Sequence, residues 1–164
     1  MKVSRSSRHA KIVGDFGEAL VLYWLSKYGY ECARIDYTGI DLIARNPHKK
    51  EVMGISVKSR TRTEGTESDV VNIPIDNFEK AKNACHAFGC VPYFAIVVDA
   101  GEIIRGFVLS MDHLLKISPP TNQASYWKMN TKHLEKYRND SETIIFAQFS
   151  IPLYSLLNKR ELEI

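Results

Sequence analysis

Residues 54–60 of the chain read GISVKSR, a run that is typical of a buried β-strand but ends in a lysine and an arginine. Successive side chains of a strand point to opposite faces, so Ser56 and Lys58 share one face. Lysine is seldom buried unless it has a partner or its amine reaches water. The chemistry of this strand therefore depends on whether a carboxylate lies nearby.

A suitable carboxylate occurs one strand earlier. Residues 40–45 predict a strand after the turn Thr38-Gly39, and the turn composition of residues 46–50 separates it from the strand at 51–57. In that hairpin, Asp41 and Lys58 fall towards the same end of the sheet. If Asp41 also shares the face of Ser56 and Lys58, then a carboxylate, a hydroxyl and an ammonium converge, and Glu18 of the preceding helix borders them.

The remaining pattern mixes helices with short strands. It predicts helices at 15–28, 77–88, 111–117 and 131–137, strands at 31–35, 70–75, 91–98, 102–109, 126–129 and 143–150, and a weak last helix. Asp76 is expected to cap the second helix. The order αβββαβ predicts an α/β fold with a mixed central sheet flanked by helices. Residues 118–122 (SPPTN) read as a linker between a core, 1–117, and an α/β extension, 118–164, packed on it as one domain overall.

Composition restricts the partners and the compartment. The 164 residues carry 22 Lys and Arg against 19 Asp and Glu, so a polyanionic partner is permitted but not required. The 3 cysteines, Cys32, Cys85 and Cys90, show neither zinc-site nor disulfide-framework spacing. No stretch approaches the ~20 apolar residues that span a bilayer. These features predict a soluble cytoplasmic protein without a membrane partner.

The residues around Lys58 suit metal-assisted hydrolysis of a phosphodiester. Mg²⁺ takes hard oxygen ligands, commonly one or two carboxylates with waters and substrate phosphate. A lysine beside the metal can orient the attacking water or stabilise the charge that develops on the phosphate. Arg60 and Arg62 would hold neighbouring phosphates. A strand-end lysine that reaches water and an aspartate that serves the turn are the alternative interpretations.

The segments GEALVLYWLSKYGYECAR, TGIDLIAR and GISVKSR, in this order, resemble the PD-(D/E)xK nuclease superfamily, especially archaeal-type Holliday-junction resolvases and related proteins. The resemblance covers about residues 10–98. It implies a restriction-endonuclease-like core, with Glu18, Asp41 and Lys58 as catalytic residues and Mg²⁺, or Mn²⁺, as cofactor. It also implies Asp41, Glu18 and the backbone carbonyl of Val57 as metal ligands, and a homodimer.

Ser56 departs from the pattern of the superfamily, which has Glu or Asp at this position. Another acid could fill the gap, as in restriction endonucleases that take it from the following helix. Glu79 is then the first candidate, Asp76 the second and Glu67 the third. Alternatively, Asp41 and Glu18 suffice through bound water, or the site is inactive.

The sequence thus leads to a metal-dependent DNA endonuclease, resolvase-like or restriction-like. Its catalytic residues would be Asp41, Lys58, Glu18 and Glu79. The expected contacts with nucleic acid are Arg60, Arg62, Lys82 and Arg8. The alternative is a catalytically degenerate nuclease fold that binds nucleic acid or a protein without cleavage. An RNA-processing relative is a third hypothesis, although the histidine context expected for it is missing.

Overall fold

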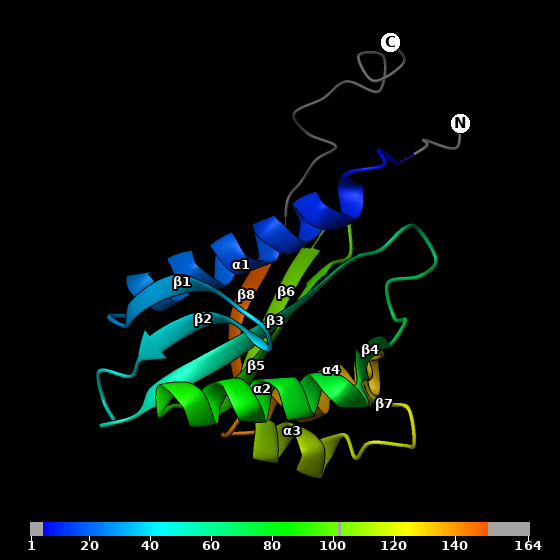
Figure 1. Ribbon diagram of the computed structural model, residues 1–164. Coiled ribbons are helices and arrows are strands. Elements are labelled where there is room, and N and C mark those ends of the chain that lie inside the picture. Colours follow the sequence, from blue (N-terminus) through cyan, green and yellow to red (C-terminus); the bar gives the residue numbers. More distant parts are fainter. Residues whose placement is uncertain (1–4, 102, 151–164) are drawn as a thin grey trace.

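A six-stranded mixed sheet forms the centre of the molecule. The computed structural model describes residues 5–101 and 103–150, apart from the side chains of 146–150. The strand order is β1-β2-β3-β5-β6-β8 (Figure 1), and all neighbours are antiparallel except β3 and β5. The strands are β1 (Glu31–Tyr37), β2 (Ile40–Arg45), β3 (Val52–Thr61), β5 (Val91–Asp99), β6 (Ile103–Ser110) and β8 (Ile144–Ser150). The parallel pair requires a crossover, which a helix between the two strands supplies.

Helix α1 (His9–Lys27) covers one face of the sheet. Val21, Trp24 and Leu25 of this helix pack on residues of β2, β3, β5 and β6, including Leu42 and Ile55. Figure 1 shows α1 on one side of the sheet and α2 on the other. The strands carry apolar side chains on both faces because both faces are covered.

The opposite face is covered by three helices and a small second sheet. These elements are α2 (Ile75–Phe88), α3 (Met111–Ile117), α4 (Thr131–Arg138) and the antiparallel pair β4 (Val71–Pro74) and β7 (Ala124–Trp127). Their core includes Phe78, Leu114 and Trp127, the last of which stacks on Tyr137 with ring centroids 3.9 Å apart. Residues on either side of the segment 118–122 therefore share one hydrophobic core.

The structure corrects several predicted boundaries. Helix α1 begins at His9 rather than at residue 15. The sequence pattern did not show this earlier start, because the first turn is largely exposed and lacks the apolar period of the rest of the helix. An ion pair between Lys11 and Asp15, one turn apart, supports that first segment. Pro74, not Asp76, occupies the N-cap of α2. The predicted last helix falls within 151–164, outside the described residues.

Among the described helices, none combines the length and apolar character that crossing a membrane requires.

Candidate functional site

The register of β2 against β3 determines the face on which Asp41 lies. Leu42 pairs with Ile55, so continuing this antiparallel register by one residue places Asp41 beside Ser56. Lys58, two residues further along β3, points to the same face as Ser56. Its Nζ lies 6.0 Å from the centroid of the Phe94 ring, which belongs to the core on the α2 side. Asp41, Ser56 and Lys58 therefore share one face of the sheet.

Asp41 bridges β2 and β3 where the two strands separate. Its Oδ2 accepts a hydrogen bond of 2.6 Å from the backbone N–H of Val57. The N–H and C=O of one strand residue point towards the same neighbouring strand. The carbonyl of Val57 is therefore also directed to the β2 side, where Asp41 lies.

Glu18 reaches this region because α1 packs very closely on β3. A Cβ atom at Gly17 would overlap the hydroxyl of Ser59, so glycine permits the close approach. The next residue, Glu18, is half-buried, and burial followed by the negative charge of Asp41 raises the pKa of its carboxyl. Arg34 of β1, with its Nε 3.9 Å from Glu18 Oε2, partly offsets this shift of the pKa. The carboxylate of Asp41 therefore lies close enough to act on that of Glu18, and a bound cation would relieve this repulsion.

Lys58 is half-buried in the same region, which we call the notch and define by Glu18, Asp41 and Lys58. Burial lowers the pKa of the Lys58 ammonium, and the attraction of Asp41 opposes that effect. Arg60 and Lys80 lower the pKa further, whereas Asp76 raises it. The amine therefore gives up a proton more readily than a fully hydrated lysine does.

The groups of the notch that could hold a cation are the carboxylates of Asp41 and Glu18 and the backbone carbonyl of Val57. Asp41 and Glu18 supply hard oxygen atoms, and waters and substrate phosphate commonly complete such a site. Within the described part of the chain, no group of three or more Asp, Glu, His or Cys side chains is close enough to hold one ion. Glu79 is exposed on α2 and does not complete a cluster with Asp41 and Glu18.

The other candidate acids have different partners. Asp76 forms an ion pair with Lys80 one turn along α2, and hydrogen bonds from Lys80 and Asn77 lower its pKa. Glu67 accepts a hydrogen bond from the N–H of Gly65 within the loop after β3. Ser56, only 2% exposed, occupies the position beside Asp41.

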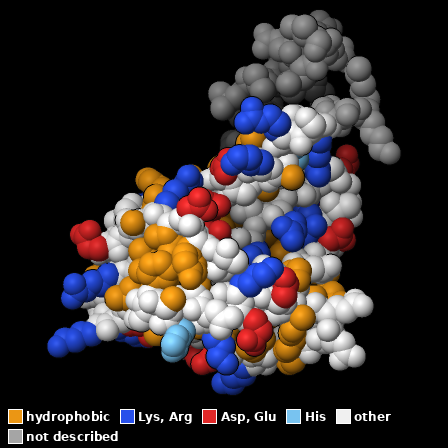
Figure 2. Space-filling view, in the orientation of Figure 1, with side chains coloured by type: hydrophobic (Ala, Val, Ile, Leu, Met, Phe, Trp, Pro, Cys, Tyr) orange, Lys and Arg blue, Asp and Glu red, His pale blue; other side chains and the backbone are white. Residues whose placement is uncertain are grey.

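The four basic residues predicted to contact nucleic acid occupy different places. Arg60 is exposed two residues after Lys58, and its Nη2 is 3.5 Å from the carbonyl of Asn72. Arg62 donates to the carbonyls of Asp69 and Val70, so it also holds the loop that follows β3. Lys82 is exposed on α2, and Arg8 is exposed just before α1. Figure 2 shows Lys and Arg side chains, with acidic ones among them, on the face between α1 and α2.

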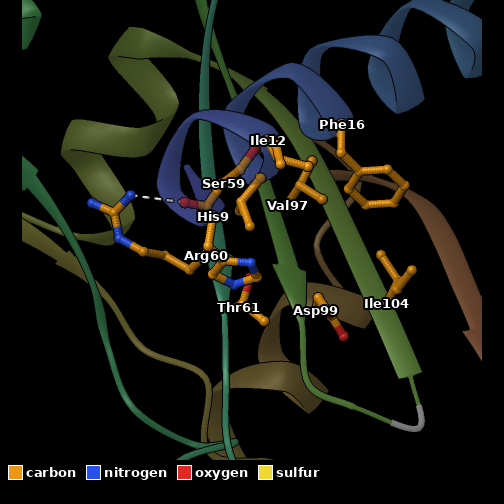
Figure 3. A pocket seen from close by; sticks show the side chains of 10 residues that line it. His9, Ile12, Phe16, Ser59, Arg60, Thr61, Val97, Asp99 and Ile104 are labelled. Carbon is orange, nitrogen blue, oxygen red and sulfur yellow. Dashed lines mark hydrogen bonds between the residues drawn. The ribbon is translucent and has the colours of Figure 1, made fainter. Parts of the chain in front are cut away.

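A mainly apolar cavity of about 250 Å³ lies next to the notch but is separate from it. It is lined by the first half of α1, by the end of β3, and by β5 and β6, with Ile12, Phe16 and Ile104 among its walls (Figure 3). Neither Asp41 nor Lys58 lines it. The dashed line in Figure 3 is the hydrogen bond from Arg60 to the carbonyl of Ser59.

Sequence reasoning missed Arg34 as a neighbour of the notch, and it missed the ion pair between Asp76 and Lys80. The spacing of Asp76 and Lys80, four residues apart on a helix, was a usable signal for an ion pair. Arg34 gave no comparable signal, because its contact with Glu18 depends on how α1 crosses β1.

A solved structure with low sequence identity to this chain has a similar fold. The structure is similar to that of Hjc, a Holliday junction resolvase from the archaeal hyperthermophile Archaeoglobus fulgidus, with a TM-score of 0.53 and 17% sequence identity over 70% of this chain and 88% of that one. No protein-family pattern matches the chain, and no curated protein sequence does. The chain thus has the mixed α/β, restriction-endonuclease-like fold of a resolvase, as the sequence predicted.

Proposed function

We propose that the protein is a metal-dependent DNA endonuclease that hydrolyses phosphodiester bonds, resolvase-like or restriction-like in its substrate. The observation that carries this proposal is the placement of Glu18 and Asp41 beside each other with Lys58 on the same face as Asp41. The likeness of the fold to Hjc agrees with it.

In this proposal, each residue of the notch has a defined task. Asp41, Glu18 and the carbonyl of Val57 hold Mg²⁺ or Mn²⁺. When bound, the metal supplies Lewis-acid polarisation of the phosphate and lowers the pKa of a water ligand. Lys58 donates a hydrogen bond to the attacking water or to a phosphate oxygen on which negative charge develops. Arg60 and Arg62 bind the adjacent phosphates, and a homodimer would present two such notches to paired strands.

A catalytically degenerate DNA-binding module is the second candidate. Ser56 favours it, because a neutral hydroxyl replaces an acid and no described third acid compensates. In that case, the basic residues still bind the phosphate backbone, and no cleavage follows.

A cleavage assay distinguishes the two candidates. We expect the protein to cut labelled four-way-junction or linear DNA in Mg²⁺ or Mn²⁺ but not in EDTA. Asp41→Ala should abolish cutting, and Lys58→Ala should reduce its rate by about 10²–10³-fold. Asp36→Ala, at an exposed position on β1, is the matched control and should cut normally. DNA binding without any cutting would favour the degenerate module. Metal-dependent cutting that survives both substitutions would refute the assigned site.

A further inference from the structure

Two arginines from distant parts of the sequence lie in one row across the sheet. Arg60 of β3 pairs in register with Val98 of β5, and Val98 pairs with Arg105 of β6. Partners in neighbouring strands share a face. Arg60 and Lys58, two residues apart, also share a face. Arg60, Val98 and Arg105 therefore lie on the same face of the sheet as Lys58. The row they form runs across the sheet from β3 to β6, away from the notch.

A cavity of about 520 Å³ lies at the Arg105 end of this row. Arg62 and Arg105 both line it, together with Gly101 of the β5–β6 turn and with Glu64 and Glu67 of the loop after β3. Arg62 is held at the strand end by a 2.7 Å hydrogen bond from its N–H to the carbonyl of Asp99. The cavity is thus bounded by Arg105 on β6, by Arg62 just after β3, and by the carboxylates of Glu64 and Glu67 on the loop.

Arg138 of α4 adds a further positive charge near Arg105, because the residue before it, Tyr137, packs against Phe107, two residues along β6 from Arg105, with ring centroids 5.7 Å apart. Burial lowers the pKa of Arg105, and the charge of Arg138 lowers it further. Between described residues, no ion pair joins Arg105 or Arg138 to a carboxylate. Arginine keeps its charge in proteins, so two guanidinium groups placed together repel each other unless an anion separates them. A bidentate phosphate would remove that repulsion.

We propose that Arg60, Arg62, Arg105 and Arg138 form an arginine track that binds the phosphodiester backbone of a nucleic acid as it leaves the notch. This inference rests on the proposed function and extends it to two residues, Arg105 and Arg138, that lie outside the sequence pattern of the site. It also gives α4, which follows the segment 118–122, a role in binding. Contacts of this kind carry no information about base sequence.

The test measures binding of fluorescent duplex and four-way-junction DNA by the full chain at several salt concentrations. Arg105→Gln with Arg138→Gln should weaken binding to both DNAs and reduce the slope of log K against log salt by about 0.9 for each lost phosphate contact. Arg45→Gln with Lys49→Gln removes the same charge from exposed positions at the opposite end of the sheet, and it should leave the slope near that of the wild type. Arg138→Gln alone changes an exposed side chain and covers the case in which Arg105→Gln disturbs folding.

The outcomes separate the track from the proposed function. If the wild type binds DNA and the double variant binds with an unchanged slope, the track is wrong and the notch is unaffected. An equal loss in the control variant would also overturn it, because net charge alone would explain the effect. If the wild type binds no DNA, the proposed function fails and the track fails with it. Arg105→Lys should keep most of the slope, since it retains the charge.

Discussion

Ser56 is the residue on which the chemistry of the notch depends most. It is 2% exposed and lies beside Asp41 in the register of the hairpin. A carboxylate at this position would join those of Asp41 and Glu18 and would give a cation a third charged ligand. Without a cation, the same carboxylate would be buried among like charges, which is unfavourable.

Replacing Ser56 by aspartate should therefore make stability depend on metal. We expect Ser56→Asp to lower the melting temperature in EDTA, and Mn²⁺ or Mg²⁺ to raise it by more than in the wild type. Ser56→Asn, which has a similar shape and no charge, should show no such gain. Differential scanning fluorimetry measures both variants. Equal metal responses in the aspartate and asparagine variants would argue against an ion bound at Asp41 and Glu18.

At this scale, sequence reasoning located the part of the site that follows strand periodicity. Ser56 and Lys58 share a face because they are two residues apart on a strand, and the short turn before β3 limited where Asp41 could lie. Glu79 had no such constraint. The direction of its side chain depends on the rotation of α2 about the helix axis, and in the structure the side chain is exposed. Likewise, neither the contact of Arg34 with Glu18 nor the proximity of Arg138 to Arg105 follows from local spacing.

At the scale of elements, a histidine–aspartate contact joins α3 to the turn before β8. His113 Nε2 lies 2.6 Å from Asp140 Oδ2, and the Thr143 hydroxyl donates to the same oxygen over 2.7 Å. Burial raises the pKa of Asp140, but the hydrogen bonds from His113, Thr143 and the N–H of Glu142 outweigh it, so the pKa of this carboxyl is lowered overall. Glu142 also approaches the other ring nitrogen of His113, at 3.5 Å.

This contact should make part of the free energy of unfolding depend on pH. Since the pKa of Asp140 is lower in the folded than in the unfolded chain, its contribution is complete above the unfolded value, about 3.9, and disappears as the pH falls through the folded value. We expect Asp140→Asn to reduce the free energy of unfolding by about 1–3 kcal/mol near neutral pH. The difference from the wild type should shrink as the pH falls below this unfolded value. Urea titrations at a series of pH values measure it, with Asp36→Asn as an exposed control. A difference that does not change with pH would contradict the assignment.

Helices and strands with a clear hydrophobic pattern in the sequence could be predicted. Elements whose position depends on contacts with distant parts of the chain were harder to predict. The hairpin β5–β6 and the helix α2 follow from continuous apolar runs and from helical spacing that ends at Gly89. The strand at 71–74 was expected from the sequence, but its partner was not. It lies outside the main sheet and pairs with β7, which is about 50 residues later in the chain. Such a pairing depends on which surfaces remain to be buried after the main sheet forms.

At the scale of the whole molecule, the sheet separates two hydrophobic cores, and each contains one of the two tryptophans of the chain. Trp24 of α1 lies on one side, and Trp127 of β7 lies on the other, against Phe107 and Tyr137. The sequence predicted residues 118–164 to pack on the core as part of one domain. The contacts of Trp127 with β6 and α4, and the pairing of β8 with β6, tie the two parts together. Unfolding of either part should then expose apolar surface of the other.

We therefore expect both cores to unfold in one transition. Trp24→Phe leaves Trp127 as the tryptophan reporter, and Trp127→Phe leaves Trp24. In each variant, the urea midpoint from tryptophan fluorescence should equal the midpoint from far-ultraviolet circular dichroism, which is the behaviour of a two-state domain. Trp127→Phe should lower both midpoints together, because the smaller ring leaves space in a core where Trp127 has no exposed surface. If Trp127 instead reports a midpoint well below that of the circular dichroism signal, the part after residue 118 unfolds first. The chain would then consist of two units, and the arginine track would join separately folding parts.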